Sequence, residues 1–581
     1  MLRLRHRGPS TRFTSLLVIA LAVPGAALAG SAGDIAGDAQ PLATVDRLTM
    51  PAVDHGAALA ADAAAAGPGV PVRFAIPQAV RITPLSHGTW ETLDDGDRLW
   101  RLQVRSAGAV SLNFGFTTYS MPLGGSLVIY TPDASAVLGP WDNRHNKAHR
   151  QLWTPILPGD EAVIEVRVPA QRVDRLGLEL TAINHGYREF GKPENPDKSG
   201  ACNIDVVCPE SAGWDSQIRS VAALSRSGFF FCSGFLVNNT AEDFTPYFMT
   251  AAHCTVTAGN APSLVVYWNY FNSTCRPPGS PSSGGLGDGS LSQNQSGATF
   301  LASSPVSDYT LVELDEIPDP SANVFYAGWD ARDVDFSSAV AIHHPQVQEK
   351  RISFEHDPTT TTSYRCPNPP GISGCFGPLD DGTHIRVADW DEGTTEGGSS
   401  GSPLFNPNGL VIGQLHGGYA ACGNDLPDWY GRISASWDLG LKEWLDPGDS
   451  GTLVQQGLES VCTDPCCPDA TTLCLNNRRF QVQVDWKNFE EEEGVGSRVQ
   501  FGADDSGLLW FFDPANWEML VKVLNGCGTN GHYWVFTAAT TNVEYTITVT
   551  DTENGEIWTR TNPLGTAAPA VTDIEAFATC P

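Results

Sequence analysis

The stretch Met249-Thr250-Ala251-Ala252-His253-Cys254 places a histidine and a cysteine directly after an apolar, strand-like run. A second stretch, Gly398-Ser399-Ser400-Gly401-Ser402-Pro403, is a serine turn flanked by glycines. Between them, Asp308 opens a β-type run over 307–314. The chain therefore carries His, Asp and Ser, in that order, within one block rich in strand and turn signals. These contexts together predict a β fold that assembles three side chains into one site.

Acyl transfer requires these residue types. A serine hydroxyl is a weak nucleophile, so a neighbouring imidazole must take its proton and later pass it to the leaving amine. We assign these roles to Ser400 and His253, and we assign to Asp308 the task of holding the imidazole in the right tautomer. The alternatives for this acid are Asp315 and Asp330. The backbone amides of Gly398 and Ser400 are the candidates for binding the oxyanion. The prediction is acyl-enzyme hydrolysis with no metal and no other cofactor.

Composition excludes several classes of protein. The 581 residues exceed the usual size of one domain and favour three or four. Acidic residues outnumber basic ones by 66 − 35 = 31, and 17% of positions are charged, which argues against nucleic acid as a partner. The 58 glycines, 41 prolines and 41% hydrophobic residues are typical of a turn-rich, all-β globular chain without long helices.

The first 29 residues have the features of a secretory signal peptide. Arginines at positions 3, 5, 7 and 12 precede the apolar run Leu16–Val23, and Ala27–Ala29 offers a small-residue cleavage site after Ala29. The run is too short to span a bilayer, and we expect no membrane span elsewhere. A secreted, extracellular protein follows, with its 14 cysteines mostly oxidised.

The rest of the chain divides into blocks. Residues 30–198 hold an Ala-rich lead-in to about position 75, expected to be loosely ordered and without chemistry, and a sandwich-like β-domain over about 80–190. The polar linker 191–198 precedes the block 199–460, which contains the three candidate residues. A Cys-rich linker, 461–468, leads to a β-sandwich-like module over 469–581.

The block 199–460 resembles the trypsin-like serine proteases and, within them, the bacterial lysyl endopeptidases. The stretches that carry the resemblance, besides the His and Ser boxes, are Cys202–Pro209, Val265–Tyr270, Ala341–Pro345 and Gly413–Gly418. The resemblance implies a catalytic domain of two six-stranded β-barrels acting on protein or peptide substrates. The block before the linker resembles, more loosely, the pro-region of such precursors, which implies a zymogen.

The resemblance also implies a specificity. Asp428 matches the family's acid at the base of the pocket for the residue before the scissile bond, and a desolvated carboxylate there selects a cation. His416 matches a histidine that narrows this pocket by stacking on a tryptophan. That tryptophan has no counterpart in this chain, and Tyr364 is the candidate substitute. Cleavage after Lys is the first expectation, and cleavage after both Lys and Arg is the alternative.

Disulfides and processing follow from the same match. It implies the pairs Cys202–Cys422, Cys208–Cys275 and Cys232–Cys254, and it leaves Cys366 and Cys375 as a local fourth pair. Lys198 stands directly before Ser199, so a Lys-specific enzyme would release its own N-terminal region there. The alternative is that the linker joins two permanent domains.

The C-terminal module has no assigned chemistry. Its aromatics are expected to be mostly core, with binding of an unknown surface or polymer as the alternative. Its acidic turns show no calcium-loop pattern, and export favours disulfides over zinc for Cys462, Cys466, Cys467 and Cys474. We expect a monomer. The competing function for the whole chain is an inactive protease fold that serves in binding or adhesion.

Overall fold

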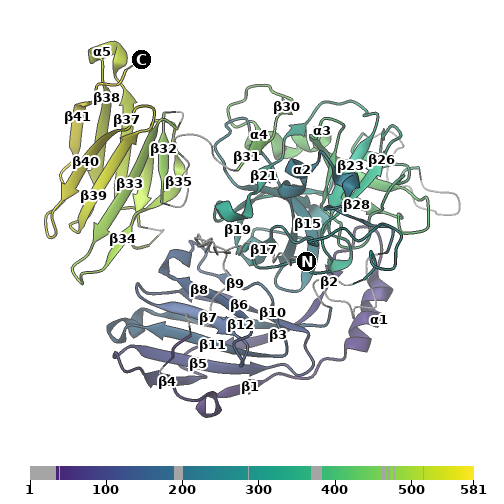
Figure 1. Ribbon diagram of the computed structural model, residues 1–581, viewed down its shortest axis with the longest axis horizontal. Helices are drawn as coiled ribbons and strands as arrows, with labels where there is room; N and C mark the ends of the chain where they lie inside the picture. The colour runs from purple at the N-terminus through teal and green to yellow at the C-terminus, as the bar shows by residue number, and fades with distance from the viewer. Residues whose placement is uncertain are drawn as a thin grey trace, which may run out of the picture.

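The computed structural model describes residues 35–37, 39–188, 200–285, 287–367, 382–460, 466, 471–476, 478–513 and 516–580. The predictions at Ala29, Lys198, Cys375, Cys462 and Cys467 lie outside these residues. In Figure 1 the purple N-terminal domain, the teal and green central domain and the yellow C-terminal domain are each built from β-sheets. The predicted all-β class is confirmed. In the described residues, no helix is long and apolar enough to cross a membrane.

The N-terminal domain is a sandwich of two sheets around one core. The first sheet has the order β1 (Arg47–Thr49), β5 (Arg98–Arg105), β11 (Glu161–Val168), β7 (Ser126–Tyr130) and β8 (Val137–Asp142), with β4 (Thr89–Thr92) on β5. The second has the order β10 (Leu157–Pro158), β6 (Ser111–Ser120), β12 (Gly177–Gly186) and β3 (Ala75–Ile82), with β9 (Leu152–Trp153) on β6. In β5, Trp100 and Leu102 are buried, as their period of two predicts, but Leu99 and Arg101 are buried as well, so this strand is covered on both faces.

The central domain contains two large sheets, each with an apolar cluster of its own, and a third cluster combines residues of both sheets where they pack together. The first has the order β18 (Asn294–Ser296), β17 (Leu264–Tyr267), β14 (Val221–Arg226), β15 (Phe230–Leu236), β16 (Tyr247–Ala251), β20 (Tyr309–Leu314) and β19 (Ala298–Ser304), with β2 (Val72–Arg73) on β15. The second has the order β13 (Ile204–Asp205), β24 (Arg351–Glu355), β23 (Ala339–His343), β27 (Pro403–Phe405), β28 (Val411–Gly418), β29 (Asp428–Arg432), β26 (His384–Val387) and β25 (Thr360–Thr362), with β22 (Trp329–Asp330) and β30 (Val454–Gln455) attached. A separate pair is formed by β21 (Phe325–Tyr326) and β31 (Leu458–Glu459).

The C-terminal domain is a second sandwich, with its own core. One sheet has the order β32 (Leu473–Leu475), β33 (Phe480–Lys487), β39 (Glu544–Asp551) and β40 (Glu556–Asn562), with β34 (Glu493–Val495) on β33. The other has the order β35 (Ser497–Ala503), β36 (Ser506–Trp510), β37 (Met519–Asn525), β38 (Tyr533–Ala539) and β41 (Val571–Phe577). The acidic turn of this domain contacts the N-terminal sandwich, because Glu492 pairs with the buried Arg172 at 2.7 Å.

Helices are short throughout the described residues. The α-helices are α1 (His55–Ala65), α2 (Asp215–Ser220), α3 (Ile433–Ser436), α4 (Lys442–Leu445) and α5 (Cys527–Asn530). A π-helical stretch, Trp437–Leu441, joins α3 to α4. The 3-10 turns are Leu42–Thr44, Asn143–His145, Ala170–Arg175, Pro209–Ser211, Ala252–Cys254, Ala261–Ser263, Pro320–Ala322 and Pro345–Val347.

The expectation that residues up to about 75 are loosely ordered is wrong. This segment forms β1, α1 and β2, and the side chain of Asp54 caps α1 by accepting from the amide of Ala57. Tertiary contacts hold the helix, since Asp62 pairs with Arg73 at 2.7 Å and with Arg188 at 3.1 Å. The order of this segment therefore comes from distant charges rather than from periodicity. Figure 1 places α1 and β2 where the N-terminal and central domains meet.

Candidate active site

Two neighbouring strands bring His253 and Asp308 together. Strands β16 and β20 are antiparallel, with Ala251 opposite Tyr309, so the turn after β16 lies beside the residue before β20. Asp308 Oδ2 lies 2.7 Å from His253 Nδ1, and Asp308 Oδ1 accepts from the His253 amide at 2.9 Å. Both contacts fix the imidazole with Nδ1 toward the acid and leave Nε2 as the free ring nitrogen.

The acid of this pair is deeply buried. Asp308 is 2% exposed, and burial raises the pKa of its carboxyl, an effect that His253 partly offsets. The two alternative acids lie elsewhere: Asp315 pairs with His149 at 2.8 Å, and Asp330 pairs with Arg332 at 2.6 Å. Of the three candidate acids, Asp308 is the one that contacts His253.

Ser400 lies on a turn whose glycines have backbone conformations that other residues rarely adopt. Gly398 has φ +96° and Gly401 has φ +82°, and a Cβ on Gly401 would come within 2.7 Å of the amide nitrogen of Ala251. The serine turn thus packs directly against the end of β16, beside the histidine turn. The carbonyl of Ser400 accepts from the amide of Ser233 at 2.8 Å, which ties the turn to β15.

Buried polar groups that the sequence did not single out hold the serine turn. Ser233 Oγ donates to the carbonyl of Gly398 at 3.0 Å, and His343 Nδ1 lies 2.8 Å from Ser399 Oγ. His343 is fully buried, and burial together with the charge of Arg351 lowers its pKa to about 3. His343 belongs to one of the stretches quoted for the family resemblance, which was the available signal.

The reacting atoms have unfilled hydrogen-bonding capacity. Nε2 of His253 is buried and has no hydrogen-bond partner among the described residues. The amides of Gly398 and Ser400 donate no hydrogen bond to any residue that the structure describes. A base nitrogen and two backbone donors are therefore available near Ser400, although no hydrogen bond joins Nε2 to the Ser400 hydroxyl in this state. Such contacts often tighten only when substrate binds.

Asp428 is a buried carboxylate without a cation. It is 1% exposed at the start of β29, and its Oδ2 accepts from Trp390 Nε1 at 2.9 Å and from Thr395 Oγ1 at 2.6 Å. Its Oδ1 points to the backbone of Gly418, where a Cβ would come within 2.1 Å of it. No Lys or Arg in the described residues pairs with Asp428, and burial raises the pKa of the carboxyl. Glycine at position 418 thus leaves the space that this carboxylate oxygen occupies.

A cluster of stacked rings lies near both Asp308 and Asp428. The ring of Tyr364 stacks on that of His416, with centroids 3.5 Å apart and planes 2° from parallel. His416 stacks in turn over His253 at 5.5 Å, and its Nδ1 lies 2.9 Å from Nε2 of His384. Tyr364 therefore occupies the stacking position for which it was the candidate substitute, and His384 is a partner that sequence reasoning missed.

The described residues contain one group of side chains close enough to share a metal ion, namely His253, Asp308 and His416, with ligand atoms within 4.8 Å of one another. Each of these side chains is already engaged. The ring of His253 faces Asp308, and Nδ1 of His416 faces His384. The arrangement fits a proton-transfer site better than a metal site.

Disulfides and ion pairs brace the frame around the site. The observed pairs include Cys202–Cys422, Cys208–Cys275 and Cys232–Cys254, the three that the resemblance implies. Cys366 is disulfide-bonded, while Cys375 lies outside the described residues. The C-terminal domain adds Cys466–Cys474 and Cys527–Cys580.

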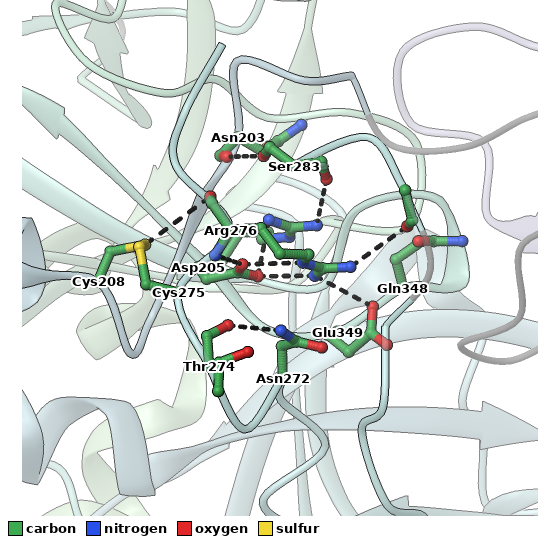
Figure 2. Close-up of polar contacts among 12 residues, drawn as sticks. Asn203, Asp205, Cys208, Asn272, Thr274, Cys275, Arg276, Ser283, Gln348 and Glu349 are labelled. Atoms are coloured by element: carbon green, nitrogen blue, oxygen red, sulfur yellow. Dashed lines mark hydrogen bonds and ion pairs between the residues drawn. A yellow bond between two sulfur atoms is a disulfide. The ribbon is translucent and has the colours of Figure 1, made fainter. Parts of the chain in front are cut away.

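Figure 2 shows the buried charge cluster around Asp205, which lies beside the Cys208–Cys275 bridge. Asp205 pairs with Arg276 and with Arg351, each at 2.7 Å, and Arg276 also contacts Glu349 at 3.5 Å. The cluster fixes the first residues of the central domain to the second sheet. Nearby, the amide of Gly200 donates to the Glu396 carboxylate at 3.0 Å, four residues before Ser400.

Comparison with known proteins gives matches along most of the chain. A family described as "Lysyl endopeptidase, C-terminal domain" matches residues 196–431, and one described as "Lysyl endopeptidase N-terminal domain" matches residues 47–187. A lysyl endopeptidase of Pseudomonas aeruginosa is 27% identical over 389 residues, which cover 61% of this chain and 77% of that protein.

Two solved structures are also similar. A Glu endopeptidase in complex with MPD is 14% identical, covers 41% of this chain and 95% of its own, and has a TM-score of 0.25. The HtrA-type protease AlgW with tripeptide is 13% identical, covers 61% and 96%, and has a TM-score of 0.26.

Proposed function

Because the chain belongs to the lysyl endopeptidase family of serine endopeptidases, we propose that it is secreted and cleaves proteins after lysine through an acyl-enzyme. One observation carries the specificity: the Asp428 carboxylate is buried beside β28 with no cationic partner among the described residues. A buried unpaired charge is costly, and a substrate ammonium would relieve that cost. A substrate with an apolar side chain at this position would leave the charge unpaired, so the pocket selects against it.

The catalytic roles follow from the contacts around His253. Nε2 of His253 accepts the proton of the Ser400 hydroxyl as Oγ bonds to the substrate carbonyl carbon, and the Asp308 carboxylate stabilises the resulting imidazolium through Nδ1. The amides of Gly398 and Ser400 then donate to the oxyanion. His253 returns the proton to the leaving amine as the peptide bond breaks. Water, deprotonated by the same nitrogen, hydrolyses the ester and frees Ser400.

The ring stack bears on the choice between Lys and Arg. Tyr364 is stacked on His416. Burial raises the pKa of the Tyr364 phenol, and the nearby negative charge of Asp428 raises it further, so the stack lies close to this carboxylate. A stack of this kind narrows the space available to a branched guanidinium more than the space for an unbranched ammonium. Selection for Lys over Arg is accordingly part of the proposal.

Covalent trapping tests the mechanism. The protein freed of its N-terminal region is treated with a phosphonyl fluoride, which transfers its phosphonyl group to an activated serine and releases fluoride. The expected result is one phosphonyl adduct on Ser400, lost in the Ser400→Ala variant and strongly slowed in His253→Ala. A Ser282→Ala variant, changed at an exposed serine away from the site, is the control and keeps the adduct on Ser400. An adduct at another residue, or none in a folded protein, would contradict the assignment.

A further inference from the structure

A segment of the N-terminal region, Gly67–Arg73, lies on the candidate active site. Its last two residues form β2, which pairs antiparallel with β15 through Val72 opposite Phe231 and Arg73 opposite Phe230. Phe231 directly precedes Cys232, whose disulfide partner Cys254 follows His253. The segment therefore adds a strand to the first residues of β15, which β16 leaves unpaired, on the strand that the disulfide ties to the histidine turn. Strand addition is a common way for an extended peptide to bind a sheet.

The first half of the segment covers the other side of the site. The amide of Val70 donates to the carbonyl of Gly67 at 3.2 Å, and the intervening Gly69 has φ +75°, as in a turn with Pro followed by Gly. A Cβ on Gly69 would lie 3.6 Å from the ring of His416 and from the hydroxyl of Tyr364. The turn thus sits on the stacked pair that adjoins Asp428.

The same turn also meets the strand and the loop that flank Ser400. A Cβ on Gly417 would come within 2.9 Å of the amide nitrogen of Gly69, and one on Gly397 would come within 3.2 Å of the Val72 side chain. Gly417 lies on β28, and Gly397 directly precedes the serine turn. The segment therefore contacts β15, β28 and the residue before the serine turn, and it bridges the site from side to side.

The segment lacks the features of a good substrate. It contains no lysine, and its single basic residue, Arg73, is paired with Asp62 of α1 at 2.7 Å rather than with Asp428. Its Pro68-Gly69 turn also departs from the extended backbone that a cleaved peptide presents. The segment can therefore occupy the site without being cut.

The N-terminal region is anchored well beyond this segment. Phe74 and Trp153 share one buried cluster with Phe231 and Tyr267 of the central domain. Lys147 and His149 both contact Asp315 near the end of β20, His149 at 2.8 Å. Such an interface does not depend on the covalent linker.

We infer that Gly67–Arg73 is a built-in inhibitor that binds the active site of the protease domain, and that cutting the linker after Lys198 leaves it bound. This inference rests on the proposed function. Activation then takes two steps: cleavage of the linker, and removal of the bound N-terminal region. The occupant of this surface is thus a segment of the same chain, held by strand addition and by contacts with the Tyr364–His416 pair.

The test uses the full chain with Lys198→Gln, which blocks cleavage at that linker position. Gly69→Trp adds bulk toward Tyr364 and His416, and Gly37→Trp is the control, because this exposed glycine lies outside the segment and nothing lies within 4 Å of a Cβ there. Hydrolysis of a small lysyl amide is compared with that of protein stripped of its N-terminal region. We expect the Lys198→Gln chain to be at least tenfold slower than the stripped protein, Gly69→Trp to restore activity at least tenfold, and Gly37→Trp to have no effect. Full activity of the Lys198→Gln chain would overturn the inference.

A second readout needs no turnover. Hydrogen exchange is measured in peptides covering residues 230–231 of the same chains carrying Ser400→Ala. Faster exchange in Gly69→Trp than in Gly37→Trp supports docking of the segment, and equal exchange contradicts it. Inactivity of the stripped protein would instead count against the proposed function, while the exchange result would still decide whether the segment binds.

Discussion

Replacing Asp428 by Asn should abolish the preference for lysine while leaving the fold intact. The amide oxygen of Asn can still accept from Trp390 and Thr395, so the change removes the charge and, at the other carboxylate oxygen, an acceptor for the backbone amide of Ala420. Loss of one partner of a buried ion pair costs about 3–5 kcal/mol. Since about 1.4 kcal/mol corresponds to a factor of ten, kcat/KM for a lysyl substrate should fall about 10²- to 10⁴-fold.

The assay compares peptide amides that differ only at the residue before the scissile bond: Lys, its neutral isostere norleucine, and Arg. We expect the Asn variant to lose activity on Lys and to keep or gain activity on norleucine. Asp425→Asn, which changes an exposed acid three residues away, is the control and should leave all three rates unchanged.

Stability provides an independent check on the same residue. Burial raises the pKa of Asp428 above its ordinary value, so the ionised carboxylate disfavours the folded state in the absence of substrate. The Asn variant should therefore unfold at the same temperature as the wild type or higher at neutral pH. Retained selectivity for Lys in a folded Asn variant would refute the reasoning and would point to another acid.

Three further predictions concern neighbouring features. Tyr364→Ala removes the stack on His416 and should raise the ratio of cleavage after Arg to cleavage after Lys about tenfold. An unchanged ratio in a peptide digest would contradict a role for Tyr364 in the wall of the specificity pocket. Burial lowers the pKa of His343 to about 3, so the unfolded state takes up a proton at a higher pH than the folded state does. The stability present above pH 6.5 should therefore fall by about 4–5 kcal/mol as the pH drops toward 3. In His343→Asn the free energy of unfolding should depend less steeply on pH, and an equal dependence would exclude this residue as the cause. Replacing both Cys232 and Cys254 by Ala should lower the free energy of unfolding by about 3 kcal/mol, as measured by denaturant titration, whereas an unchanged midpoint would show that the bridge adds no stability.

The sequence was informative where chemistry restricts the residue type. Acyl transfer needs a serine on a glycine-flanked turn and a histidine after a strand, so His253 and Ser400 stood out, and β16 and β20 then placed Asp308 beside His253. Strand periodicity likewise identified β33 and β39 of the C-terminal module, which bury alternate residues. The central strands β14 and β16 are buried on both faces, so their burial follows no period of two.

Residues that act through tertiary contacts could not be found in this way. The Ala-rich helix α1 buries only Ala58 and has no clear apolar stripe, yet Asp62 ties it to Arg73 and Arg188. Trp390 and Thr395 orient Asp428 from other parts of the chain. Such pairings leave no local pattern, which is why the lead-in was expected to be loosely ordered and its position on the active site was not predicted.

The most direct test is a digest of an unrelated denatured protein mixture, with every new terminus identified by mass spectrometry. The protein freed of its N-terminal region is compared with its Ser400→Ala variant, whose linker is cut by added wild-type enzyme that is then removed. The account predicts new termini after Lys with the active protein and none with the variant. Termini after Lys and Arg alike would contradict selection by the stacked pocket wall, and equal cutting by the Ser400→Ala variant would contradict the catalytic assignment itself.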